Sequence, residues 1–182
     1  MLQTLYVIAH TFFKICRLEL GPQDLPSSRA FLLLVTATYM CISTIIPIIF
    51  EIPILKAILQ TFVEVGITFF LTFSLLYMTG FYARTLQTLT AIMGIDVFFH
   101  LIAIPILILE LYFKSAGIDI GLTQILAILL VSWNLTIYAH ILRHALSTEF
   151  FVGFVITFIY LLVTIIILQT LFPTPLPEVI TQ

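Results

Sequence analysis

Long apolar runs separated by short polar interruptions dominate the chain. A helix that crosses the ~30 Å hydrocarbon core of a bilayer needs about 20 mostly apolar residues, because each residue advances it by ~1.5 Å. A helix also bonds every backbone polar group within the segment, as a lipid environment demands. Suitable segments cover residues 30–50, 57–79, 85–113, 122–141 and 150–172. The pattern therefore predicts an all-α polytopic membrane bundle, residues 30–172, with five transmembrane helices.

The third segment is the longest of these, and it contains Gly94 and Pro105. Both residues weaken a straight helix, so we expect this segment to be tilted or locally kinked. Three prolines follow the last segment, between Pro173 and Pro177. Proline lacks the N–H group that a helix needs, so we expect residues 173–182 to form an extended proline-rich tail.

The first 20 residues have a different pattern. Apolar residues recur at helical spacing, and the basic residues lie to one side of this stripe. The stripe consists of Leu5, Ile8, Phe12, Ile15 and Leu18, and the basic residues are Lys14 and Arg17. This pattern predicts an amphipathic helix over residues 1–20 that lies in the membrane interface. Residues 21–29 contain Gly and Pro and are expected to link this helix to the first span.

The composition excludes a water-soluble domain. Hydrophobic residues make up 62% of the 182 residues, charged residues make up 9%, and the mean hydropathy is +1.23. Soluble domains are about 45–50% apolar and about 25% charged. Lys and Arg number seven against nine Asp and Glu, so we expect no binding of nucleic acid through a basic patch. The lipid bilayer is the first partner that the sequence predicts.

The basic residues are distributed unevenly over the two sides of the predicted bundle. Alternation of the five spans puts on one side Lys14, Arg17, Arg29, Arg84 and Arg143, and on the other side Lys56 and Lys114. Short loops rich in Lys and Arg stay in the cytoplasm. We therefore expect the inner membrane of a bacterium, with a cytoplasmic N-terminus and the C-terminus outside. The basic side, together with His144, is expected to contact anionic lipid headgroups or a partner at the inner interface.

Polar residues inside the apolar spans are the most informative positions. Glu64, Asp96 and His100 are ionisable residues of this kind, and Asn134 lies near the middle of the fourth span. Asp96 and His100 are four residues apart and so share one helix face. Counting ~1.5 Å per residue from the span ends puts all four near the same depth. The sequence predicts one intramembrane polar layer made of these four residues.

Three interpretations of this layer remain open. It can be structural, with interhelical hydrogen bonds of ~0.6 kcal/mol each that fix the packing of the spans. It can be a proton or ion path, in which Asp96 and His100 relay protons and Glu64 acts as a gate. It can also face a partner subunit instead of the bundle interior.

His140 and His144 form a second pair at a spacing of four, beside Arg143. Two imidazoles one turn apart can bind a metal or haem iron, but no carboxylate follows at a matching spacing. Cys16 and Cys41 are expected to be small apolar fillers. The sequence contains no phosphate-binding glycine loop and no hydrolase motif. We therefore predict no metal, no cofactor and no catalytic residues.

The tyrosines fit the aromatic belt that marks the ends of membrane spans. Those placed near predicted span ends are Tyr6, Tyr77, Tyr82, Tyr112 and Tyr138.

The plan of the chain resembles the Yip-domain family of small membrane proteins. The resemblance rests on the interfacial start, the Gly21-Pro22 and Asp24-Leu25 pairs before the first span, and five closely spaced spans. In that family an Asp-Leu-x-Gly-Pro stretch precedes the first span and a Gly-Tyr pair lies in the third. Here the two pairs come in the opposite order, and Gly94 is followed by Ile95. The resemblance implies a non-enzymatic protein that acts through partners or bilayer organisation.

Together these observations predict a non-catalytic accessory or scaffold protein of the membrane. The alternative is a proton- or ion-coupled transporter or channel subunit that uses the layer of Glu64, Asp96 and His100. A bundle of 20.6 kDa cannot easily enclose a path alone, so we expect a homo-oligomer or a complex with other membrane proteins.

Overall fold

The computed structural model describes residues 2–173, with side chains from residue 7 onward. Most of the predicted tail, residues 174–182, lies outside this range. The longer helices are α1 (Leu2–Cys16), α2 (Arg29–Ser43), α4 (Ile54–Met78), α5 (Thr85–Ser115), α6 (Gly121–Leu146) and α7 (Phe150–Leu171). Shorter turns of helix are η1 (Pro22–Asp24), α3 (Ile45–Ile49) and η2 (Tyr82–Arg84).

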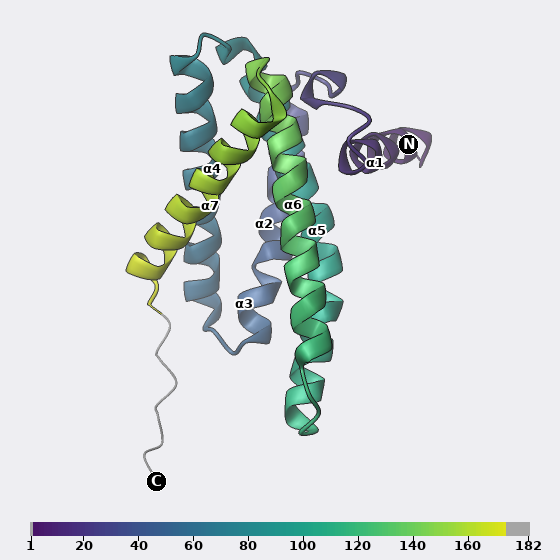
Figure 1. Cartoon of the computed structure of the whole chain (residues 1–182), viewed down its shortest axis with the longest axis vertical. Coiled ribbons are helices and arrows are strands. Elements are labelled where there is room, and N and C mark those ends of the chain that lie inside the picture. Colours follow the sequence, from purple (N-terminus) through teal and green to yellow (C-terminus); the bar gives the residue numbers. More distant parts are fainter. Residues whose placement is uncertain (1, 174–182) are drawn as a thin grey trace.

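Within residues 2–173, five helical stretches are long and apolar enough to cross a bilayer, with α2 and α3 forming the first together. They run alternately up and down in Figure 1, and α7 leans away from α6 toward α4. The prediction of an all-α bundle with five spans is confirmed.

Two span boundaries differ from the sequence prediction. The first span is divided at Thr44, because Pro47 in α3 has no N–H group for the carbonyl of Ser43. The fourth span ends at Leu146, five residues beyond the predicted residue 141. Its last turn is closed by Ser147, which has the left-handed φ of 54°, and by a bond from Thr148 N–H to the Arg143 carbonyl. This is the Schellman arrangement of a helix C-terminus.

Helix α1 lies across the direction of the spans, beside the upper part of α5 (Figure 1). The ring of Phe12 occupies the space over Gly94 of α5, where a Cβ atom would lie within 2.0 Å of the ring. Trp133 of α6 donates a hydrogen bond of 3.2 Å to the carbonyl of Cys16, and His140 bonds the carbonyl of Leu20 at 2.9 Å. The amphipathic helix is therefore packed against the bundle over its C-terminal half.

The core lies where α2, α5 and α6 meet. Ile92, Ile95 and Ile141 are fully buried there, together with Tyr39 of α2. Helices α6 and α7 approach more closely than side chains usually permit, because a Cβ atom on Gly153 would come within 2.4 Å of the Ala139 carbonyl oxygen. Small residues at such a crossing let two backbones touch in a membrane.

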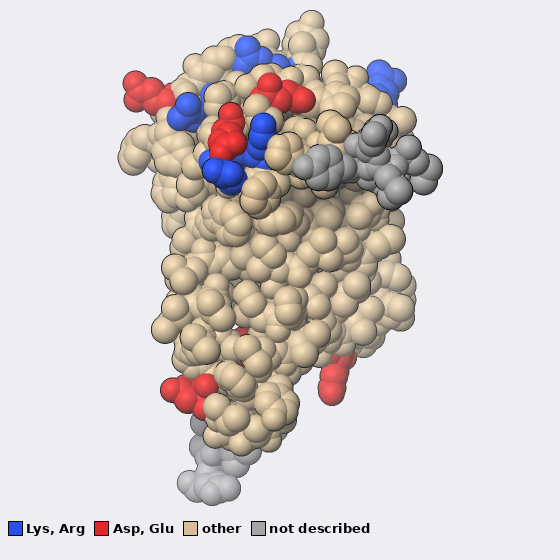
Figure 2. Space-filling model, turned by 90° about the vertical axis from the view of Figure 1, so that its right-hand side faces the viewer, with Lys and Arg blue, Asp and Glu red and all other residues tan. Residues whose placement is uncertain are grey.

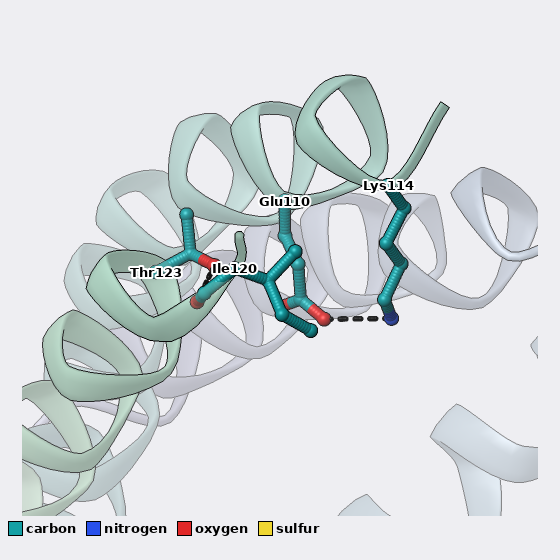
Figure 3. Close-up of polar contacts among 4 residues, drawn as sticks. All are labelled: Glu110, Lys114, Ile120 and Thr123. Carbon is teal, nitrogen blue, oxygen red and sulfur yellow. Dashed lines mark hydrogen bonds and ion pairs between the residues drawn. The ribbon is translucent and has the colours of Figure 1, made fainter. Parts of the chain in front are cut away.

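Charged side chains gather at the two ends of the molecule. On the face drawn in Figure 2, Lys and Arg residues lie at the upper end together with acidic residues, and a wide band almost free of charged atoms separates this end from acidic residues below. At the lower end, α5 and α6 form a hairpin (Figure 3). There Lys114 pairs with Glu110 at 2.8 Å, and the Thr123 hydroxyl donates to the Ile120 carbonyl at the start of α6. An uncharged band between two charged ends is typical of a membrane-spanning bundle.

Candidate functional site: a polar cavity between the spans

The four residues of the predicted polar layer line one cavity. Glu64 comes from α4, Asp96 and His100 come from α5, and Asn134 comes from α6. The cavity has a volume of about 290 Å³ and is also lined by residues of α2, α3 and α7. Its volume is large enough for several water molecules, and the polar groups in its wall offer them hydrogen-bond partners. The faces of three spans thus converge on one polar space about halfway along the bundle.

Asp96 is held by two side chains of α6. The Tyr138 hydroxyl donates a hydrogen bond to its carboxylate Oδ2 atom, and the Asn134 side chain lies close enough to interact with the same carboxyl group. Asn134 and Tyr138 are four residues apart and therefore lie on one face of α6. The bond from Tyr138, with Asn134 beside it on the same helix, positions the carboxyl group in the cavity wall.

Glu64 lies on another wall of the same cavity. Its carboxyl group interacts with the hydroxyl group of Tyr39, which belongs to α2. The Tyr39 and His100 rings also lie perpendicular to each other, with 5.2 Å between the ring centroids. Each of the two acids therefore has a tyrosine partner on a neighbouring helix, and Tyr39 connects Glu64 with His100.

The orientation of His100 determines which of its ring nitrogens remains available. Its Nδ1 atom lies 2.8 Å from the carbonyl oxygen of Asp96, one turn earlier in α5. A carbonyl oxygen only accepts hydrogen bonds, so Nδ1 carries the hydrogen. In the neutral ring Nε2 is then an acceptor, and it gains a proton when the ring becomes charged.

Three tyrosines were missed as members of this site. Tyr39 and Tyr160 were not singled out, and Tyr138 was assigned to the aromatic belt, which is wrong because it lies in the cavity wall. The error followed from the predicted end of the fourth span at residue 141. With α6 extending to Leu146, Tyr138 lies two turns inside the helix. Its spacing of four from Asn134 is the signal that identifies it.

The basic residues predicted for the inner interface have different surroundings. Arg84 turns inward: its guanidinium donates to the carbonyls of His144 and Ala145 and to the Ser147 hydroxyl, at 2.7–3.0 Å. It therefore caps the C-terminus of α6, a position where a cation is favourable. Arg17 forms an ion pair of 2.9 Å with Glu19. Arg29 is exposed, whereas Lys14, Arg143 and His144 are half-buried.

The histidine pair and the cysteines do not build a metal site. The His140 and His144 rings lie 4.5 Å apart, but the described residues contain no group of three or more His, Cys, Asp or Glu that fits a metal ion. Both cysteines are free thiols, Cys16 buried and Cys41 exposed on the surface of α2. Burial raises the pKa of the Cys16 thiol to about 11, so this thiol is protonated at neutral pH.

Comparisons of the chain with protein-family models, with curated proteins and with solved structures found no match. The resemblance to the Yip-domain family therefore stays a prediction. The fold itself defines the class: the chain is an all-α, polytopic integral membrane protein. What distinguishes it within that class is a cavity lined by Glu64, Asp96 and His100 between its spans.

Proposed function

We propose that the protein is a small transporter or channel subunit that accepts a proton or another positive charge in the cavity between its spans. The observation that carries this proposal is the convergence of Glu64, Asp96 and His100 on one cavity of about 290 Å³. Ionisable groups inside a membrane are costly and are retained mainly where charge is bound or moved. The described residues that line the cavity include no Lys or Arg, so protonated His100 is the one side chain among them that can carry a positive charge.

The arrangement supports a relay of protons across the cavity. Asp96 and Glu64 are exchangeable acids, and the Nε2 atom of His100 is a third site for a proton. Tyr39 and Tyr138 each bond one carboxyl group and can keep it in place as its charge changes. In this relay Asp96 and His100 of α5 pass the proton, and Glu64 of α4 admits it.

A flux measurement tests the proposal. The full chain is reconstituted in lipid vesicles that enclose a pH-sensitive dye, and a potassium diffusion potential drives proton entry. We expect Asp96→Asn to abolish proton flux while the protein still inserts and elutes as the wild type does. Glu110→Gln is the matched control, because Glu110 is ion-paired with Lys114 at the outer hairpin and does not line the cavity. Equal flux through the wild type and Asp96→Asn contradicts the proposal.

A second candidate is the non-catalytic accessory or scaffold protein that the sequence favours. It is supported by the polar bonds between spans, such as Ser43 to Thr61 at 3.3 Å between α2 and α4. Tyr160 of α7 likewise donates to Thr72 of α4 at 3.2 Å. In this role the layer fixes the packing of the bundle for a partner protein. Asp96→Asn then lowers thermal stability or partner recovery, and the wild type carries no flux.

The proposed setting is the inner membrane of a bacterium, with the end that bears Arg29, Arg84 and Arg143 in the cytoplasm. We also propose that the chain works as a homo-oligomer or in a complex with other membrane proteins. Native mass measurement after gentle detergent extraction tests this assembly, and a lone monomer under those conditions contradicts it.

A further inference from the structure

The walls of the central cavity combine two kinds of group. One kind is acidic, Glu64 and Asp96, and the other is aromatic, with rings contributed by Tyr39, Phe99 and Tyr160. Lys and Arg are absent from the described residues that line the cavity. Acidic groups attract a cation, and aromatic rings attract it further through their negative faces.

An inorganic metal ion fits this cavity poorly. A bare cation of that kind needs several oxygen ligands at short, fixed distances around a small space. The described residues contain no group of three or more His, Cys, Asp or Glu that could hold a metal ion. The volume of about 290 Å³ is close to the lower limit of ordinary sites for small organic ligands, about 300 Å³.

The apolar part of the wall points to a ligand with a hydrocarbon body. Leu130, Leu135 and Leu161 line the cavity beside the acids and the rings. An alkylammonium ion satisfies both parts of the wall at once, because its charge can lie between the carboxyl groups while its alkyl groups contact leucine and aromatic side chains. Such a cation is also less strongly hydrated than a metal ion, so moving it out of water costs less.

We propose that the cavity binds a small organic cation, a protonated or quaternary amine with a short alkyl body. This inference rests on the proposed function, because it names the class of positive charge that the cavity accepts. Proton transfer at Glu64 or Asp96 then alternates with binding of the amine, since a carboxyl group that holds a proton no longer attracts a cation.

Binding of choline to the purified full chain tests the inference. Its uncharged isostere, 3,3-dimethylbutan-1-ol, has the same shape and serves as the matched probe. Trp133 is the single tryptophan of the chain and packs against Phe99 in the cavity wall, with 5.1 Å between the ring centroids, so its fluorescence reports occupancy. We expect choline to bind at least tenfold more tightly than the alcohol. Equal binding of the two probes overturns the inference.

Variants separate the contribution of charge from that of the rings. We expect Glu64→Gln and Asp96→Asn each to weaken choline binding at least tenfold, and Glu110→Gln to leave it unchanged. Tyr160→Phe retains the ring and should bind choline nearly as the wild type does, whereas Tyr160→Leu should bind about fivefold less tightly. Size-exclusion chromatography and thermal unfolding establish which variants are folded. If Glu64→Gln or Asp96→Asn does not fold, the comparison of Tyr160→Phe with Tyr160→Leu still tests the inference. Unchanged affinity in Tyr160→Leu contradicts the aromatic contribution, and an equal loss in Glu110→Gln contradicts the site.

The vesicle assay distinguishes failure of this inference from failure of the proposed function. If proton flux depends on Asp96 but neither choline nor tetraethylammonium binds, the inference is overturned and the proposed function stands. If choline binds as expected but no flux occurs, transport is contradicted while the assignment of the ligand class is supported.

Discussion

At the scale of single residues, the bond between Tyr138 and Asp96 joins α6 to α5 at the cavity. The contribution of this bond to stability can be tested without removing a charge, because Tyr138→Phe deletes only the hydroxyl group. Hydrogen bonds between membrane spans contribute about 0.6 kcal/mol on average and up to about 1.7 kcal/mol. We expect Tyr138→Phe to lower the free energy of unfolding by an amount within this range, measured by denaturation in detergent micelles.

The control for this variant is Tyr112→Phe. Tyr112 is 62% exposed near the C-terminal end of α5 and does not line the cavity. An exposed hydroxyl group can bond to water in both the folded and the unfolded protein, so its removal should leave the free energy of unfolding unchanged. Equal effects of the two substitutions would show that Tyr138 adds nothing beyond an ordinary surface tyrosine.

The site also shows what the sequence can and cannot predict about individual residues. Glu64, Asp96, His100 and Asn134 were placed near one depth by counting residues, and depth is fixed by helix geometry alone. That their faces converge depends on how each helix rotates about its axis, which the weak periodicity of an apolar span does not specify. A fourth span that ends at residue 141 puts Tyr138 in the aromatic belt, whereas α6 continues to Leu146 and places Tyr138 inside the bundle. In the structure His140 is buried, and its Nε2 atom bonds the carbonyl of Leu20.

At the scale of helices, the crossing of α6 and α7 depends on one glycine. A Cβ atom on Gly153 would meet the Ala139 carbonyl oxygen at 2.4 Å and the backbone nitrogen of Arg143 at 3.2 Å. Backbone atoms cannot rotate away as a side chain can, so Gly153→Ala must separate the two helices. We expect a loss of about 1–3 kcal/mol in the free energy of unfolding, the usual cost of overpacking. Gly66→Ala is the control, because no atom lies within 4 Å of the added Cβ. A stable Gly153→Ala variant would contradict this packing.

The attachment of α1 to the bundle leads to a chemical prediction. Phe12 covers Gly94, and the next turn of α1 buries the Cys16 thiol. Gly94→Leu should displace the Phe12 ring and loosen α1. The pKa of Cys16 then falls from about 11 toward its ordinary value of 9.0, and the thiolate fraction at pH 8 rises about 100-fold.

Alkylation of Cys16 by a maleimide measures this release, in a Cys41→Ala background that removes the exposed thiol. At pH 8 the parent should react slowly, whereas Gly94→Leu should react readily. Gly66→Leu introduces the same side chain into open space on α4 and should leave Cys16 unreactive. A slow reaction in Gly94→Leu would show that the Phe12 contact does not hold α1.

The helices themselves were largely predictable, and the exceptions have local causes. The apolar runs identified all five spans because length and hydropathy are properties of a single segment. The division of the first span at Thr44 follows from Pro47, which the count of apolar residues ignores. The docking of α1 on Gly94 could not be predicted, because it depends on contacts between segments about 80 residues apart in the sequence.

At the scale of the whole molecule, five spans place the two ends of the bundle on opposite sides of the membrane. Which end faces the cytoplasm depends on charge. The end formed by the start of α5 and the end of α6 has Arg84 and Arg143, and the hairpin between α5 and α6 has Lys114 paired with Glu110. Orientation follows the number of Lys and Arg residues in short loops, so the end with Arg84 and Arg143 should remain in the cytoplasm.

Single cysteines at the two ends test this orientation. Thr148→Cys lies in the loop between α6 and α7, and Ala116→Cys lies in the hairpin between α5 and α6, both at exposed positions in a background without Cys16 and Cys41. A membrane-impermeant maleimide added to intact cells should label Ala116→Cys and leave Thr148→Cys unlabelled until the cells are opened. The reverse result would invert the topology, and Glu64 would then lie nearer the cytoplasmic end of its span than the outer end. Proton entry would in that case have to begin from the cytoplasm, so the same labelling also fixes the side from which the proposed relay is loaded.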